Sequence, residues 1–319
     1  MVSAGQVAAE VRNQAFRWAT TNPSGHPVVK GGLKFSELVA EKSGGKMIVK
    51  LYPGAVLGND AQVLSALQSG GVEFGAMNTG QLQTLAKEFA VVDLPFLFND
   101  YSEVDAIMDG AVGKRLAEQL PEKGVVNLAY YDLGFRNLTN SKRPVKTLED
   151  LQGMTIRVIQ VPTYEASINA LGAKAVPMPF TELYSALEQK KVDGQENPLS
   201  VITANRFENV QKHLTLTRHV YNPQSFLMSK KAWDKLNKDE QDIITAAAAE
   251  SAVYERKVSR DAQERSLTII RKTMEVVELP APEIARIREK LKPVTEKFSA
   301  SIGPDFVRFV FAELEKLRK

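Results

Sequence analysis

Cysteine is absent from this chain of 319 residues, which excludes disulfides, thiolate metal sites and cysteine nucleophiles together. Histidine is scarce: the chain has three, His26, His213 and His219, and none has the spacing of a metal-ligand pair. No stretch approaches the roughly 20 apolar residues that a membrane-spanning helix needs. The sequence therefore predicts no metal ion, no cofactor and no transmembrane segment.

An excess of charge of one sign is also missing. Lys and Arg number 41 and Asp and Glu number 38, a net charge of +3, which is too small and too scattered to indicate a nucleic-acid partner. The chain has no Gly-x-Ser-x-Gly elbow, no phosphate-binding loop and no dinucleotide fingerprint. We therefore assign no catalytic residues, and we expect the protein not to be an enzyme.

Short strand patterns alternate with helix patterns along the first two thirds of the chain, which predicts an α/β fold. Strands are expected at residues 15–20, 47–52 and 72–77, with intervening helices that end at Gly44 and Gly70. A second series has expected strands at 154–159 and 175–178, helices at 162–171 and from Thr181 onward, and a short helical turn at 147–151.

The two series resemble each other in sequence. Ser65-Ala66-Leu67-Gln68 is matched 120 residues later by Ser185-Ala186-Leu187-Glu188, and Val72-Glu73 is matched at the same offset by Val192-Asp193. The match is either a coincidence among common helix formers or the mark of two similar lobes. Two lobes that face each other across a cleft would suit the capture of a ligand.

The last third of the chain is mostly helical. No proline or glycine interrupts residues 239–272, so one helix there would reach about 50 Å and brace both lobes. A further helix is expected at 284–298, with a break or kink at Pro293. A final amphipathic helix is expected at 306–317, after the break at residues 301–304.

Three polar features are candidates for a binding site. Arg157 lies inside a strand of β-branched residues, and a buried guanidinium must be paired. It either lies on an exposed face, or belongs to a structural ion pair, or is an anchor for a ligand carboxylate, which matches its planar fork. The polar run Gly194-Gln195-Glu196-Asn197-Pro198 is either a turn or a ligand contact, and Arg136 is either a solvated loop residue or a second contact.

Several motifs, in order along the chain, resemble the solute-binding proteins of tripartite ATP-independent periplasmic (TRAP) transporters, of the DctP and sialic-acid type. The similarity runs from about Phe16 to about Trp233, and the long helix fits beyond that. The motifs are the segments 51–53 and 57–58, the Leu-Pro-Phe element at 93–98, and the segments 134–136, 151–157, 178–184 and 192–198.

The resemblance implies a fold: α/β, a two-lobed periplasmic-binding-protein architecture with mixed sheets, crossing hinge strands and one long helix that spans both lobes. We expect lobe I to comprise residues 1–133 and 222–261. We expect lobe II to comprise residues 134–221 and 262–319. Hinge closure of the lobes on a ligand is part of the same expectation.

The resemblance also implies roles for individual residues. Arg157 matches the family arginine that binds the substrate carboxylate, Asn197 the amide that orients it, and Arg136 a second arginine near the same group. Asn78 falls where relatives place a polar contact to the rest of the ligand. His26, on the first loop at the mouth of the cleft, is a weaker candidate.

Glu73 completes the set of ligand-binding candidates. Under the alternative hypothesis, an enzyme acting on a bound carboxylate on the same scaffold, either His26 or Glu73 would be the base. Sialic-acid-type members carry an acidic residue where Asn78 stands and a basic one where Gln81 stands. These neutral amides favour a smaller acid, and uronates, hydroxy acids, dicarboxylates and aromatic acids stay open.

The expected function is therefore that of an extracytoplasmic protein that captures a small organic acid anion. It would deliver this anion to TRAP membrane permease subunits, although a sensory partner is an alternative. Residues 1–6 show no basic-then-apolar leader, so either the protein is cytoplasmic or a signal peptide has been removed. The resemblance favours the periplasm, and a monomer is the simpler oligomeric state.

Overall fold

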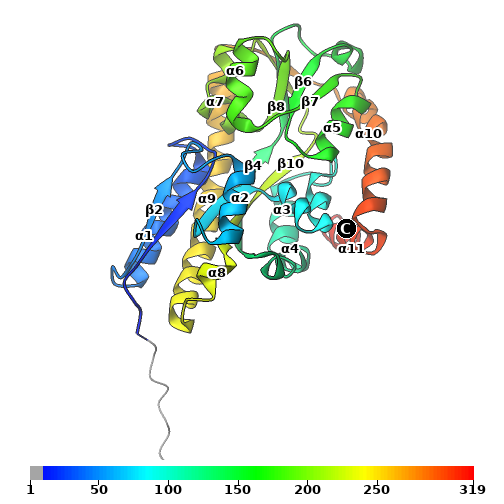
Figure 1. Ribbon diagram of the computed structural model, residues 1–319. Coiled ribbons are helices and arrows are strands. Elements are labelled where there is room, and N and C mark those ends of the chain that lie inside the picture. Colours follow the sequence, from blue (N-terminus) through cyan, green and yellow to red (C-terminus); the bar gives the residue numbers. More distant parts are fainter. Residues whose placement is uncertain (1–9) are drawn as a thin grey trace, which may run out of the picture.

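The computed structural model describes residues 10–319, which form two lobes, each built on one sheet (Figure 1). The sheet of lobe I has the order β2-β1-β3-β10-β4, and that of lobe II the order β11-β9-β5-β8-β6-β7. The first contains β1 (Gln14–Ala19), β2 (Met47–Tyr52), β3 (Phe74–Asn78), β4 (Val125–Phe135) and β10 (Tyr221–Ser229). The second contains β5 (Asn137–Asn140), β6 (Thr155–Val158), β7 (Lys174–Pro177), β8 (Gly194–Asn197), β9 (His213–Leu216) and β11 (Glu275–Glu278). Both sheets mix parallel and antiparallel pairs, as predicted.

Each lobe contains the same β-α-β-α-β unit. In lobe I the strands β1, β2 and β3 alternate with α1 (Pro27–Lys42) and α2 (Asp60–Ser69); in lobe II β6, β7 and β8 alternate with α5 (Pro162–Ala170) and α6 (Leu183–Glu188). In both units the first strand lies between the other two, and all three are parallel. The matched segments 65–68 and 185–188 fall on α2 and α6, and the matched pairs 72–73 and 192–193 directly precede β3 and β8, which supports the interpretation as two similar lobes.

The chain passes between the lobes several times. Arg136 joins β4 to β5, and residues 217–220 join β9 to β10. The helix α9 (Lys238–Ile270) packs on α1 and β4 in lobe I and on α7 (Leu199–Ala204) in lobe II. The crossing strands and the long helix spanning both lobes are therefore confirmed.

The remaining helices cover the two sheets and the junction between them. α10 packs on α5 in lobe II, whereas α11 packs on α3 and α4, which belong to the range expected for lobe I. The exact lobe boundaries stay a prediction. These helices are α3 (Tyr101–Met108), α4 (Ala111–Ala117), α8 (Lys230–Trp233), α10 (Ala281–Ile302) and α11 (Pro304–Leu317). Short 3₁₀ turns are η1 (Thr79–Thr84), η2 (Lys87–Asp93), η3 (Pro121–Lys123), η4 (Leu148–Leu151), η5 (Phe180–Glu182) and η6 (Phe207–Asn209).

Two local predictions differ from the structure. Pro293 does not break the helix, because α10 continues through it, and a kink there stays a prediction. Buried side chains on both sides of the proline, Leu291 and Val294 among them, hold that helix against the protein and offset the lost hydrogen bond. Thr181 does not cap a helix either: it lies within η5, and α6 begins at Leu183 without a side-chain cap.

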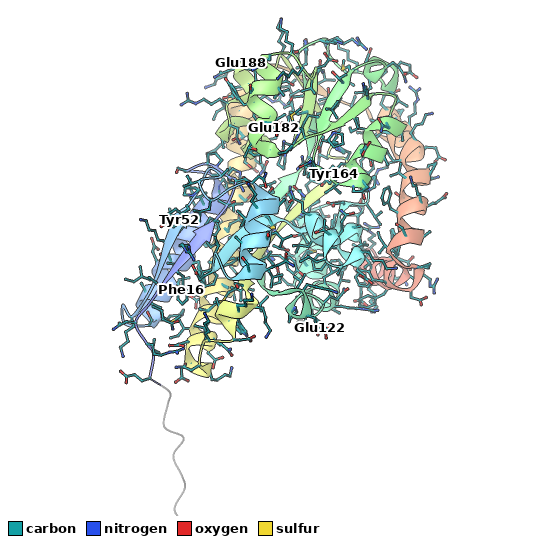
Figure 2. The ribbon with its side chains drawn as sticks, viewed as in Figure 1. Phe16, Tyr52, Glu122, Tyr164, Glu182 and Glu188 are labelled. Carbon is teal, nitrogen blue, oxygen red and sulfur yellow. The ribbon has the colours of Figure 1, made fainter. Side chains whose placement is uncertain are left out.

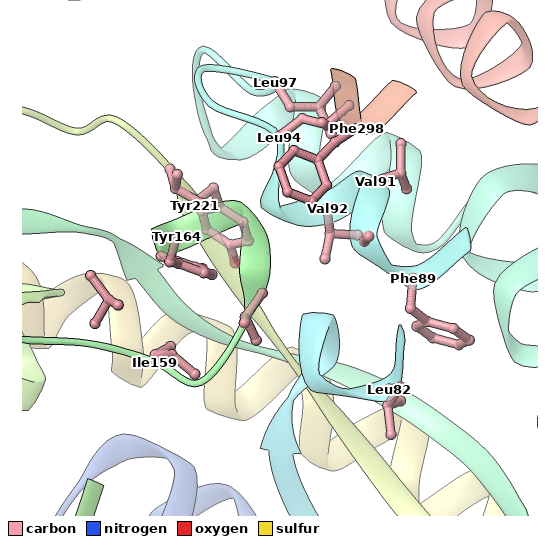
Figure 3. Close-up of a cluster of buried hydrophobic side chains, with 14 of the residues drawn as sticks. Leu82, Phe89, Val91, Val92, Leu94, Leu97, Ile159, Tyr164, Tyr221 and Phe298 are labelled. Atoms are coloured by element: carbon pink, nitrogen blue, oxygen red, sulfur yellow. The ribbon is translucent and has the colours of Figure 1, made fainter. Parts of the chain in front are cut away.

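A hydrophobic cluster joins the lobes. It contains side chains of η2 and the following loop, such as Phe89 and Leu94, together with Tyr164 of α5 and Phe298 of α10 (Figure 3). Figure 2 places Tyr164 at the junction of the lobes and Glu188 at the far end of lobe II. Within residues 10–319, no helix is both long and apolar enough to cross a membrane.

Candidate ligand-binding cleft

A cleft with a volume of about 180 Å³ lies between the lobes, and loops at the carboxyl ends of strands line it. In lobe I, Asn22 follows β1, Asp60 begins α2 and Asn78 ends β3. In lobe II, Ile159 follows β6, and Asn197 ends β8. The two units therefore contribute corresponding positions, at the edge where open parallel sheets bind ligands.

Arg157 is the charged group that lobe II contributes. The side chain is 2 % exposed, and its Nε and Nη2 donate to the carbonyl oxygen of Met178 at 3.0 and 2.6 Å. Its Nη1 is buried and has no hydrogen-bond partner in the structure, and the guanidinium lies 5.8 Å from the ring centre of Phe180. Burial lowers the pKa of Arg157 to about 10, helped by the positive charge of Arg136, so the group stays cationic at neutral pH.

The two strand-end amides are held by neighbouring amides. Asn197 donates from Nδ2 to Gln195 Oε1 at 2.5 Å, and Gln195 in turn donates to Thr139 at 2.9 Å. Asn78 accepts from Gln224 Nε2 at 2.6 Å. These contacts fix the orientation of both amides before a ligand arrives.

Asp60 also lines the cleft, although the sequence did not identify it as a candidate binding residue. Its two carboxylate oxygens accept from Thr21 Oγ1 and from Gln81 Nε2, both at 3.1 Å. Burial raises the pKa of Asp60, while these hydrogen bonds and the charge of Arg157 oppose the rise. The available signal was its position at the start of a helix, after the loop that leaves the carboxyl end of β2.

Arg136 is not among the residues that line the cleft. It is fully buried where the chain crosses between the lobes, and it pairs with Glu196 through both Nε and Nη2. Its Nη1 donates to Asn222 Oδ1 at 2.9 Å, and its guanidinium lies 5.1 Å from the ring centre of Tyr164. The structure thus places Arg136 in an ion pair at the junction of the lobes.

The family model for bacterial extracellular solute-binding proteins, family 7 (DctP), matches residues 18–301. The chain belongs to this family. Among its relatives is the C4-dicarboxylate-binding periplasmic protein DctP of Rhodobacter capsulatus, 34 % identical over 289 residues, which are 90 % of this chain and 86 % of the relative. The resemblance drawn from the sequence motifs is thereby confirmed.

Two solved family structures show the same fold. A TRAP solute-binding protein of Ochrobactrum anthropi is 53 % identical, with a TM-score of 0.88 and 97 % of each chain covered. The sugar acid binding protein DctPAm of Advenella mimigardefordensis, in complex with galactonate, is 42 % identical. Its TM-score is 0.94, and the match covers 96 % of this chain and 99 % of that one. The two-lobed α/β fold class is therefore confirmed.

The last two candidates, His26 and Glu73, do not line the cleft of this DctP-family protein. His26 is the N-cap of α1: its Nδ1 accepts from the backbone N–H of Val28, and burial lowers its pKa to about 3. Glu73 lies at the opposite end of β3 from Asn78, where it accepts three hydrogen bonds from Arg17. Of the six predicted ligand-binding residues, the cleft brings together Arg157, Asn197 and Asn78.

Proposed function

We propose that the protein captures a small organic acid anion in the interlobe cleft, with Arg157 as the carboxylate anchor. The supporting observation is the buried Nη1 of Arg157, which has no partner in a group that otherwise donates to Met178. A ligand carboxylate would supply the missing acceptor. The Advenella relative binds galactonate and the Rhodobacter relative is named for C4-dicarboxylates, and both ligands are carboxylates.

The cleft also accounts for how binding is coupled to a change of shape. Its lining comes from both lobes, so a bound anion makes contacts that exist only when the lobes are close together. Ligand binding would therefore shift the population toward the closed form, with the crossing segments as hinges. Asn197 would help orient the carboxylate, and Asn78 would contact the rest of the ligand.

Family membership supports delivery of the anion to TRAP membrane permease subunits on the periplasmic side. We propose that the protein acts there as a monomer and without catalysis. The enzyme alternative loses support because neither of its candidate bases, His26 or Glu73, is among the lining residues. Recovery of chemically unchanged ligand after long incubation would argue against turnover.

The test compares acid binding by wild type, Arg157→Ala and Arg17→Ala. Protein is first unfolded and refolded to remove any co-purified ligand. Calorimetry then measures Kd for a panel of uronates, aldonates, C4-dicarboxylates and aromatic acids. Arg157→Ala should weaken binding by about 2–5 kcal/mol, or roughly 30- to 4000-fold. Arg17→Ala removes the same charge outside the cleft and should bind like wild type. Unaltered affinity in Arg157→Ala would show that Arg157 is not the anchor.

A further inference from the structure

The charged residues of the cleft are few and come from opposite lobes. Among the described residues that line it, Arg157 is the only cation and Asp60 the only acid. They do not form a salt bridge with each other, since Asp60 is held by Thr21 and Gln81 and Arg157 by Met178. A ligand that fills the space between them meets a positive group on one side and a negative group on the other.

Two features of the surroundings of Asp60 stabilise its ionised form. It is the first residue of α2, whose N-cap is Asn59 with a complete capping box, and a helix N-terminus stabilises negative charge. Hydrogen bonds donated to both carboxylate oxygens act in the same direction. Burial opposes ionisation and raises the pKa of Asp60. The ionised carboxylate therefore carries a desolvation cost, which the hydrogen bonds and the helix N-terminus offset in part.

The rest of the lining is rich in amides. Eight of the lining residues are Asn or Gln, from both lobes. Amides both donate and accept hydrogen bonds, as hydroxyl groups do. They suit a polyhydroxylated ligand, and none of them can neutralise a second ligand carboxylate. With Asp60 ionised, the empty cleft has no net charge, so a monoanion leaves it at −1 and a dianion at −2.

We infer that Asp60 is a specificity-determining residue that makes the cleft accept hydroxylated monocarboxylates and reject dicarboxylates. The inference rests on the proposed function, because it requires Arg157 to bind one carboxylate. A hydroxyl at the far end of the ligand donates to Asp60, whereas a carboxylate there meets a like charge in a partly desolvated site. Such like-charge contacts are a recognised source of specificity against the wrong partner.

The test uses pairs of acids that differ only at the far end. D-Gluconate is paired with D-glucarate, D-galactonate with D-galactarate, and D-erythronate with meso-tartrate. In each pair a terminal CH₂OH is replaced by a carboxylate, while the other hydroxyls are the same. At pH 7.5, calorimetry on wild type should give a Kd for the bound aldonate at least 100-fold lower than for its paired dicarboxylate. Equal Kd values within the pair would overturn the inference.

Asp60→Asn is the decisive variant, because it removes the charge and keeps the size. The ratio of the paired Kd values should fall below about 10-fold, chiefly through tighter binding of the dicarboxylate. Asp242→Asn makes the same charge change on the exposed face of α9 and should keep the wild-type ratio. A ratio that stays at the wild-type value in Asp60→Asn would also overturn the inference.

Gln81→Lys is a second variant that guards against misfolding of Asp60→Asn. It adds a cation beside Asp60 without replacing it, and should improve dicarboxylate binding at least 10-fold relative to the aldonate. No gain would count against the role of Asp60. Arg157→Ala should weaken both members of a pair, which separates the two claims. If no acid binds to wild type, both claims fail; if an aldonate binds through Arg157 without discrimination, only the role of Asp60 fails.

Discussion

The two β-α-β-α-β units share a topology and differ in chemistry. In each, the first strand pairs with the first residues of the third: Trp18 and Ala19 face Phe74 and Gly75, and Ile156 and Arg157 face Gly194 and Gln195. Arg157 in lobe II therefore corresponds to Ala19 in lobe I. Repetition of the fold places equivalent loops on both sides of the cleft, but the arginine that lines the cleft comes from lobe II only. The lobes are alike as scaffolds and unlike as binding surfaces.

A second contrast lies between the two buried arginines. Arg136 at the lobe junction and Arg157 at the cleft are both almost fully buried. Arg136 has a carboxylate partner in Glu196 and an amide partner in Asn222, whereas Arg157 keeps one nitrogen without a partner. Burial alone does not reveal a ligand anchor. The missing partner distinguishes the arginine that we propose for ligand binding from the one that is already paired within the protein.

Replacing these two arginines should have its largest contrasting effect on the free energy of unfolding. Arg136→Met leaves Glu196 buried without its cationic partner, and the free energy of unfolding should fall by about 3–5 kcal/mol. Arg157→Met removes a desolvated cation with an unpaired nitrogen, and the ligand-free protein should be as stable as wild type or more so. Urea denaturation at pH 7.5 measures both.

Adding Glu196→Gln to Arg136→Met should recover part of the lost stability, because the uncompensated buried charge is then gone. If Arg136→Met and Arg157→Met destabilise the protein equally, the distinction between the two sites is wrong.

The sequence predicted most strands and helices of the two β-α-β-α-β units and the C-terminal helices, because their signals are local. The strand at 47–52 and the helix beginning near Asp239 follow from residue periodicity and glycine stops, and both are present as β2 and α9. The break expected at Pro293 was wrong because tertiary burial of neighbouring side chains outweighs a local helix-breaking preference. Element boundaries elsewhere differ from the expectation by a few residues.

The site was only partly predictable, because it depends on contacts between distant segments. Arg157 was found from its strand and the family motif. The partner of Arg136, Glu196, is 60 residues away, and no local pattern links the two. Asp60 and Arg157 line the same cleft only because α2 and β6, from different lobes, face each other across it. Sequence reasoning identifies candidate charges, whereas the fold decides which of them are already paired.

The difference between Phe74 and Gly194, which occupy corresponding positions, leads to a second stability prediction. A Cβ at Gly194 would lie 2.1 Å from the backbone oxygen of Thr139, so lobe II has no room for a side chain where lobe I buries a phenylalanine. Gly194→Ala should destabilise the protein by about 1–3 kcal/mol. Hydrogen exchange should show the loss of protection in lobe II amides.

Gly71→Ala is the matched control in lobe I, since no atom lies closer than 3.5 Å to the Cβ that it would add. It should be close to neutral. Equal stability of the two variants in urea would mean that lobe II tolerates a side chain at this position, and the contrast would not hold.

The smallest effect concerns how the units begin their first helices. His26 caps α1 with its ring nitrogen, whereas α5 begins after Val161 without a side-chain cap. Burial lowers the pKa of His26 to about 3, below the value of about 6.5 in an unfolded chain. The unfolded state therefore takes up a proton first as the pH falls. The stability that neutral His26 contributes is complete above pH 6.5 and is lost toward pH 3, at about 1.4 kcal/mol per pH unit.

His26→Asn keeps a side chain that can cap a helix and removes the proton uptake. Between pH 7.5 and 5.5, wild type should lose about 1.4 kcal/mol more stability than this variant, from the single pH unit below 6.5. Parallel stability curves for wild type and His26→Asn in urea would show that the cap of α1 does not make lobe I sensitive to acid. The different starts of α1 and α5 would then not distinguish the two lobes in their response to acid.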